Sequence, residues 1–157
     1  MDPLQAPANA KLLEYFASRR LEFRYPMEPE IGSTIAEVQG THPDLIDRLW
    51  RELGGLLPDD CHAVVYGSPV LRHPKSGVIF AFAGGSHTYA MRLPEAVRAI
   101  AQAAGATRVY HYRAFPEIHV KASTFDLDTI GIEWVFCNWL KGEDDWCRSA
   151  FAFAGAL

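Results

Sequence analysis

Apolar side chains recur at helical spacing most clearly between residues 41 and 54. They stand at positions i, i+3, i+4 and i+7, as Ile46, Leu49, Trp50 and Leu53. Thr41 precedes the repeat as a candidate cap, Pro43 falls in the first turn, and Gly54 follows the last apolar residue. This spacing, with these boundary residues, predicts an amphipathic helix.

Three other stretches carry helical signals. Asn9 can cap a helix over residues 10–19, and Pro94 and Gly105 bound a helix whose contact residues are mostly alanine. A last helix is predicted over residues 143–154, because acidic residues fill its first turn and the helix dipole favours negative charge there.

The stretch VIFAFAGGSHTYAMR predicts a β-hairpin near the centre of a sheet. Strands over residues 78–83 and 86–92 flank the Gly-Gly pair, which suits the positive φ angles of a two-residue turn. That turn would place Phe80 opposite Tyr89 and give the hairpin one large aromatic face and one small face. Neither face carries charge, so both should be covered, and the alanine-rich helix is the expected cover of the small face.

Shorter apolar stretches predict further strands, over residues 21–25, 62–66, 108–113, 117–121 and 132–136. The tripeptide Gly67-Ser68-Pro69 predicts a turn. We therefore predict a single α+β domain over residues 1–157, with a flexible leader over residues 1–8. Its antiparallel or mixed sheet should have about five to seven strands, packed by about three to four helices.

Composition narrows the class of protein. Of the 157 residues, 49% are hydrophobic and 22% are charged, which is typical of a folded globular domain rather than a disordered chain or a coiled coil. No apolar run approaches the ~20 residues that span a bilayer, and the first residues lack the features of a secretory signal, so we expect no membrane association. The three cysteines are an odd, widely spaced set, which indicates reduced thiols and a cytoplasmic protein. Eleven arginines against four lysines, with abundant alanine, favour a bacterial origin.

Charge is unevenly distributed behind the net charge of -4. Residues 1–60 carry six basic and eleven acidic side chains, residues 61–125 carry seven and two, and residues 126–157 carry two and six. A basic middle segment could bind nucleic acid, but it has no Lys/Arg run and no aromatic residues interleaved with basic ones. We therefore expect the segments to neutralise one another in the fold, and we expect no nucleic-acid partner.

The sequence motifs of common enzymes and metal sites are absent from the chain. The Gly-Gly pair joins two strands and lacks the helix that follows a dinucleotide or phosphate-binding loop, and no G-x-S-x-G, CxxC, HExxH or EF-hand motif occurs. We expect neither a metal nor a cofactor. Cys137 and Cys147 lie in apolar stretches and are predicted to be core thiols.

One constellation could carry chemistry, in the stretch RVYHYRAFPEIHVK over residues 108–121. A three-residue hairpin loop in its middle would place His111 opposite His119. The candidate catalytic residues are His111, His119, Lys121 and Arg113. Two imidazoles could share a metal, or act as general base and acid in phosphodiester cleavage because imidazole titrates near neutrality. The alternative is an ordinary polar ladder that faces solvent.

The C-terminal segment combines aromatic and acidic residues. Trp139 lies on a short connection just before the acidic start of the last helix, which is formed by Glu143, Asp144 and Asp145. We expect Trp139 and these carboxylates to be exposed, and Trp134 and Phe136 to lie in the core. Tryptophan beside charges is typical of an interaction surface, because its ring offers a large contact area at a small entropy cost.

Two functional hypotheses follow. The first is a non-enzymatic protein-binding module, by analogy an immunity-type inhibitor of a bacterial toxin or effector, because such proteins are small, acidic and free of catalytic motifs. Trp139 and the three carboxylates would then bind a partner with a basic surface. The alternative is a small hydrolase or nuclease that uses the histidine pair with its Arg and Lys. The two hypotheses differ in whether those four side chains meet in a concave pocket.

Overall fold

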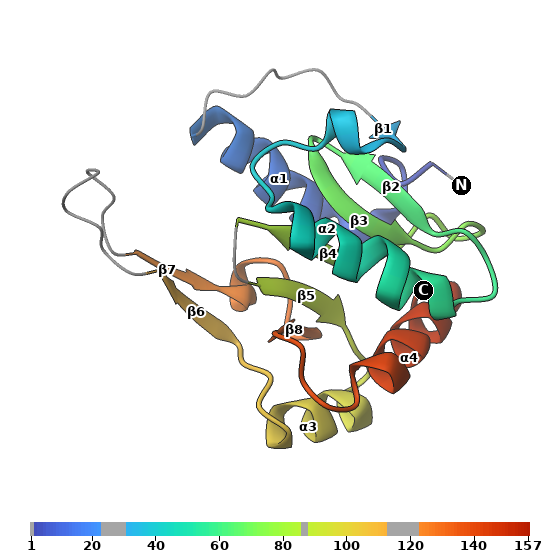
Figure 1. Ribbon diagram of the computed structural model, residues 1–157, viewed down its shortest axis with the longest axis vertical. Coiled ribbons are helices and arrows are strands. Elements are labelled where there is room, and N and C mark those ends of the chain that lie inside the picture. Colours follow the sequence, from blue (N-terminus) through green and yellow to red (C-terminus); the bar gives the residue numbers. More distant parts are fainter. Residues whose placement is uncertain (1, 23–30, 86–87, 113–122) are drawn as a thin grey trace.

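An antiparallel sheet forms the middle layer of the protein (Figure 1). The computed structural model describes residues 2–22, 31–85, 88–112 and 123–157. Within these residues the sheet has six strands in the order β1-β2-β3-β4-β5-β8, and all neighbouring pairs are antiparallel. The bounds are β1 Ile31–Gly32, β2 His62–Val65, β3 Ser68–Arg72, β4 Ile79–Gly84, β5 Thr88–Arg92 and β8 Trp134–Cys137.

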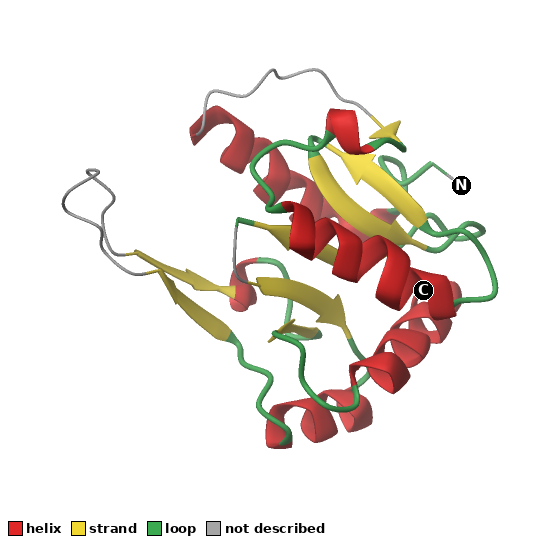
Figure 2. Cartoon of the chain, viewed as in Figure 1, coloured by secondary structure: helices red, strands yellow, loops and turns green. Residues whose placement is uncertain are grey.

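Helices cover both faces of this sheet (Figure 2). The four α-helices are α1 Ala10–Glu22, α2 Pro43–Asp47, α3 Glu95–Ala103 and α4 Glu143–Ala156. Helix α1 packs on one face, where Phe16 meets Phe82 edge to face and Phe82 in turn meets Trp134. Helices α2, α3 and α4 pack on the other face. The predicted single α+β domain is confirmed. No helix in the described part of the chain is long and apolar enough to cross a membrane.

A separate two-stranded ribbon projects from the body of the protein (Figure 1). Its strands are β6 Val109–Tyr112 and β7 Ser123–Asp126. The base of the ribbon is tied to β8, because Thr107 exchanges two backbone hydrogen bonds with Phe136. Arg108 adds an ion pair with Asp128 and donates to the carbonyl oxygen of Trp134.

The helix predicted over residues 41–54 forms, with a different cap and an irregular continuation. His42, not Thr41, caps α2, and its Nδ1 accepts the N–H of Asp44 at 3.1 Å. The backbone of Thr41 instead forms an isolated parallel bridge with Gly85, directly after β4. Two turns continue α2, namely η3 Arg48–Leu53 with π-type winding and η4 Gly54–Leu56 with 3₁₀ winding.

The hairpin of β4 and β5 forms, but its predicted register is wrong. Gly84 lies opposite Thr88 within the ladder, and Tyr89 lies opposite Ala83 instead of Phe80. Gly85 has a φ of +70°. Its N–H and its C=O both form hydrogen bonds with the segment that precedes α2. Because that glycine binds a second segment, the hairpin closes through a longer connection than the predicted two-residue turn.

A β-bulge in β4 also removes the predicted division into a large and a small face. The register with β3 shifts between Leu71 and Arg72, which leaves Phe80 as an extra residue. Phe80 and Ala81 therefore lie on the α4 side, whereas Phe82 lies on the α1 side. Side chains do not alternate strictly between the two faces of the sheet across a bulge. Each face therefore carries both large and small side chains, contrary to the prediction.

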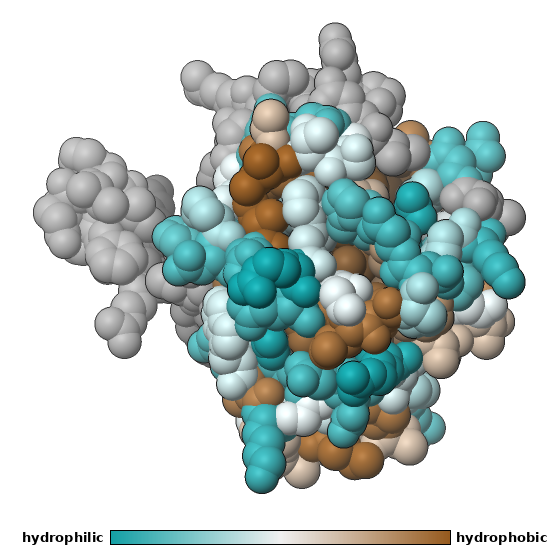
Figure 3. Space-filling model, turned by 45° about the vertical axis from the view of Figure 1, so that its right-hand side comes forward, coloured by the Kyte–Doolittle hydropathy of each residue, from teal (hydrophilic) through white to brown (hydrophobic). Residues whose placement is uncertain are grey.

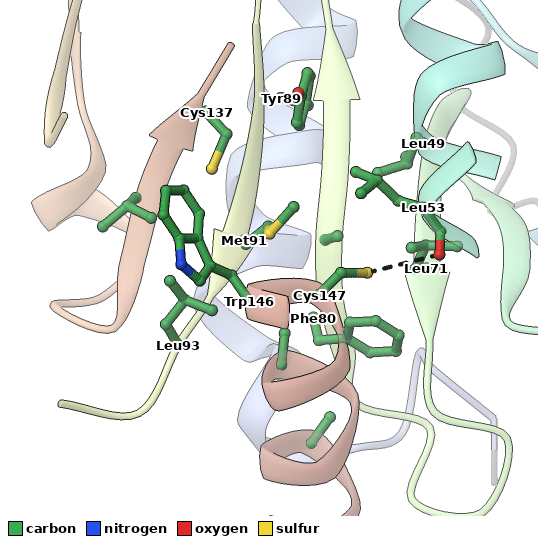
Figure 4. Packing of buried hydrophobic residues seen from close by; sticks show 14 of the residues in the cluster. Leu49, Leu53, Leu71, Phe80, Tyr89, Met91, Leu93, Cys137, Trp146 and Cys147 are labelled. Carbon is green, nitrogen blue, oxygen red and sulfur yellow. Dashed lines mark hydrogen bonds between the residues drawn. The ribbon is translucent and has the colours of Figure 1, made fainter. Parts of the chain in front are cut away.

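Helix α3 forms where predicted but packs elsewhere. It contacts α4 and β8, and Ile100 is 61% exposed although its spacing places it among the predicted contact residues. Helix α4 covers the hairpin instead, because small side chains allow its axis to approach the sheet. Figure 4 shows Trp146 and Cys147 of α4 among buried residues of the sheet, with the Cys147 thiol directed at the carbonyl oxygen of Leu53.

Strand β3 was not predicted. The turn before it is formed by Tyr66 and Gly67, both with positive φ, so Ser68 and Pro69 already belong to the strand. Two consecutive residues with positive φ are typical of the tight turns that join antiparallel strands. The ladder between β3 and β4 begins at Val70, directly after the proline, which has no N–H to donate.

The N-terminal residues pack against the domain. Ala6, within the segment over residues 1–8 that we predicted as a flexible leader, is buried in the same core cluster as residues of α4. Asn9 is fully buried and is not a helix cap: its Nδ2 donates to the carbonyl oxygens of Pro3 and Gly77, and its Oδ1 accepts the N–H of Ile79. One side chain thus joins the leader to the start of β4.

Two other predicted strands lie wholly or partly outside the described residues. Residues 117–121 fall outside them. Of residues 21–25, only Leu21 and Glu22 are described, and both belong to α1 rather than to a strand.

Strand β5 ends in a buried arginine. Arg92 is 1% exposed, donates from Nη2 to the carbonyl oxygen of Ala8 at 2.9 Å, and lies over the ring of Trp134 at 4.8 Å. Burial lowers the pKa of Arg92 to about 10, and the nearby Glu133 carboxylate opposes that shift. Arg92 and Arg108 both pair with carboxylates of the C-terminal segment, as the charge distribution predicted.

Candidate functional site

Trp139 is the most exposed of the four tryptophans. It lies on the loop between β8 and α4 and is 47% exposed, whereas Trp134 and Trp146 are buried and Trp50 is partly buried, so its predicted exposure is confirmed. One side of the ring meets the ring of Tyr89 edge to face, with ring centres 5.4 Å apart. Its φ of +49° is unusual for a residue with a side chain, and such backbone strain concentrates at functional sites.

Two of the three predicted carboxylates also lie at the surface. Asp144 and Asp145 occupy the first turn of α4 and are exposed, as predicted. Asp145 pairs with Arg148 at 3.2 Å, one turn further along the helix. Asp144 and Asp145 therefore present negative charge at the positive end of α4, a few residues after Trp139.

Glu143 does not belong to this exposed set, and the prediction of its exposure is wrong. Its side chain is fully buried and forms an ion pair with Arg48 at 2.9 Å. Its second oxygen accepts the N–H of Leu140 at 2.7 Å. A buried carboxylate is stable only when it is paired and hydrogen-bonded, and Arg48 and the loop backbone provide those partners.

Tyr89 completes this buried group. Its hydroxyl donates to Glu143 and accepts hydrogen bonds from Nε of Arg48 at 3.2 Å and from the N–H of Trp139 at 2.7 Å. Burial, together with the adjacent carboxylate, raises the pKa of Tyr89. Burial opposes charge on Arg48 too, but the bonds to Tyr89 and Glu143 outweigh that effect and raise the pKa of Arg48. We call Arg48, Tyr89 and Glu143 the buried triad, in which Tyr89 and Glu143 are buried and the side chain of Arg48 is 11% exposed.

Sequence reasoning missed Arg48 and Tyr89. They come from η3 and β5, and the contact from Arg48 to Glu143 spans 95 positions along the chain. The one local sign was a tyrosine in a strand that was expected to be covered, because a buried hydroxyl needs a hydrogen-bond partner. No periodicity connects that hydroxyl to an arginine on a helix.

The exposed Asp44 and Asp47 of α2 and the partly buried Glu52 of η3 extend the acidic surface. The pairing of Arg48 with Glu143 brings the start of α4 beside α2 and η3. The charged residues outside the buried triad on these elements and on the loop before α4 are Asp44, Asp47, Arg51, Glu52, Lys141, Asp144, Asp145 and Arg148. Carboxylates outnumber cations among them. Figure 3 shows this side of the protein as largely hydrophilic, with separate hydrophobic patches.

The predicted pairing of His111 with His119 is wrong in register. His111 of β6 lies opposite Thr124 of β7. The other candidates, His119, Lys121 and Arg113, lie outside the described residues. No cluster of three or more His, Cys, Asp or Glu side chains that could hold a metal occurs among the residues that the structure describes.

The three cysteines and one histidine are core residues. Cys61, Cys137 and Cys147 are buried free thiols, and burial raises the pKa of each, to about 11 for Cys61 and about 12 for Cys147. The prediction that Cys137 and Cys147 are core thiols is confirmed. His73 is buried against Phe151, and burial lowers its pKa.

Comparison with known proteins adds no relative to this picture. No protein-family model, no curated protein and no solved structure matches the chain.

Proposed function

We propose that this protein is a binding module for another protein, and that Trp139 is the aromatic centre of its contact surface. The observation that carries the proposal is a half-exposed tryptophan on a backbone with positive φ, beside the exposed carboxylates of α4. Tryptophans at the centre of interfaces commonly supply a large share of the binding energy.

The surrounding charge selects the kind of partner. Asp144, Asp145 and the carboxylates of α2 and η3 favour a partner with a basic surface, because complementary charge speeds association and disfavours other partners. By analogy of size, acidity and absence of motifs, the partner class that fits is a bacterial toxin or effector, which this protein would inhibit as an immunity protein does.

The triple variant Trp139→Ala, Asp144→Lys and Asp145→Lys tests this proposal. All three side chains are exposed, so the variant should still fold, with a loss of stability of about 1–2 kcal/mol because two cations then lie at the positive end of α4. Its affinity for the partner should fall by about 2 kcal/mol or more, roughly 30-fold, because an aromatic anchor and the steering charge are both lost. Immobilised protein would capture the partner from a lysate of the source organism, and the dissociation constant would then be measured with the purified partner.

A matched control removes a comparable apolar side chain and adds the same charge elsewhere. Ile35→Ala, Glu14→Lys and Asp59→Lys change exposed residues near β1, on α1 and before β2, away from the β8 edge. Binding that survives the control and is lost in the triple variant supports the proposal. A partner that binds both variants as tightly as the original protein refutes the surface.

The nuclease hypothesis has no specific observation in its favour. It depended on a cross-strand pair of His111 with His119, and the register of β6 with β7 places Thr124 opposite His111 instead.

A further inference from the structure

The hydroxyl of Tyr89 uses all of its hydrogen-bonding capacity on three partners. A phenol has one donor and two acceptor sites, and here it donates to Glu143 and accepts from Arg48 and from the N–H of Trp139. The side chain is 1% exposed, so water does not compete for these bonds. The backbone of Trp139 is thus joined directly to the buried triad.

The same triad fixes the next residue and the ring. Glu143 accepts the N–H of Leu140, so two consecutive amides of the loop donate hydrogen bonds to buried side chains. The Tyr89 ring meets the Trp139 ring at 86°, which limits the positions that the indole can occupy. Backbone and side chain of Trp139 are therefore held from the same residue.

Such support is needed because the loop conformation is intrinsically unfavourable. A φ of +49° is unfavourable for a residue with a side chain, and it persists only where surrounding contacts impose it. Without its acceptor, the Trp139 amide would lose one of the contacts that hold this conformation.

We infer that Tyr89 is a positioning residue for the contact surface of this protein. Its hydroxyl holds Trp139 in the one conformation in which the ring is presented for binding. The inference rests on the proposed function for its biological meaning, but the positioning itself is a property of the free protein. A fixed aromatic side chain binds more tightly than a mobile one, because the cost of ordering it is met before the partner arrives.

The variant Tyr89→Phe tests the inference, because it keeps the ring and removes only the hydroxyl. Backbone amide hydrogen exchange, read by NMR, would be compared between the original protein and the variant. The Trp139 amide should exchange at least about tenfold faster in the variant, since it loses its acceptor. Amides of β4 should change far less, whereas a merely structural role of Tyr89 would raise exchange throughout the core. Tyr15→Phe on α1, across the sheet, serves as the matched control.

Unchanged exchange at Trp139 in Tyr89→Phe would overturn the inference. Binding to the purified partner separates the inference from the proposed function. Positioning predicts a dissociation constant about tenfold higher for Tyr89→Phe, which corresponds to a binding-competent fraction of about one tenth. A partner that loses affinity for Trp139→Ala but not for Tyr89→Phe refutes positioning, and a partner indifferent to both refutes the proposed function.

Discussion

Replacing Arg48 with methionine should lower the free energy of unfolding by about 3–5 kcal/mol. The substitution keeps an unbranched side chain of similar length but leaves the fully buried carboxylate of Glu143 without its cation. Tyr89 and Leu140 would still donate to Glu143, yet neither supplies a compensating charge. Chemical denaturation, with stability taken from the midpoint and slope, measures the change.

Two further variants identify the buried charge as the cause. Arg51→Met removes an arginine of the same turn that is 71% exposed and paired with Asp47, so it should change stability by about 1 kcal/mol or less. The double variant Arg48→Met, Glu143→Gln removes both charges and should recover more than half of the loss. A double variant no more stable than Arg48→Met alone would contradict this account.

Replacing Asn9 with alanine should cost about 2–4 kcal/mol. The amide is fully buried and makes three hydrogen bonds to backbone groups, so alanine would leave two carbonyl oxygens and the N–H of Ile79 without partners. Thermal or chemical unfolding would show the loss directly.

Asn138→Ala is the matched control, because the same side chain is exposed on the loop before Trp139. Its effect should stay within about 0.5 kcal/mol. Equal effects at Asn9 and Asn138 would mean that the bonds of Asn9 add nothing to stability.

Local signals in the sequence were sufficient for most elements and for the fold class. The apolar repeat that includes Leu49 and Leu53 predicted a helix, and the strands β4 and β5, which are uncharged up to the last residue of β5, predicted a covered hairpin. These signals come from neighbouring residues, so they survive without knowledge of the tertiary structure. The register of the hairpin could not be predicted from such local signals, because Gly85 forms backbone hydrogen bonds with a segment more than forty residues away.

The positions of individual polar residues depended on contacts between distant segments. Asn9 has the sequence context of a helix cap, but its amide serves the start of β4. Glu143 has the sequence context of an exposed first helical turn, but it is fully buried and paired with an arginine from η3. In both cases the local sequence favours an exposed position at a helix start, but contacts with a distant segment bury the side chain. No pattern along the chain indicates those contacts.

The candidate surface was predictable to the extent that exposure follows from the sequence. Trp139, Asp144 and Asp145 lie on a short connection and at a charged helix start, and all three are exposed. The hydroxyl of Tyr89 beneath them was not predictable, since its strand carries no sign of the loop that it contacts.

Entry of Trp139 into the interface with a partner should be visible by ¹⁹F NMR of protein labelled with 5-fluorotryptophan. The four tryptophans give separate signals, and Trp139→Phe identifies the signal of interest. With the purified partner added, the Trp139 signal should shift and lose its contact with solvent, while the signals of the buried Trp134 and Trp146 stay in place. A complex in which the Trp139 signal keeps its position and its exposure to solvent would contradict the account.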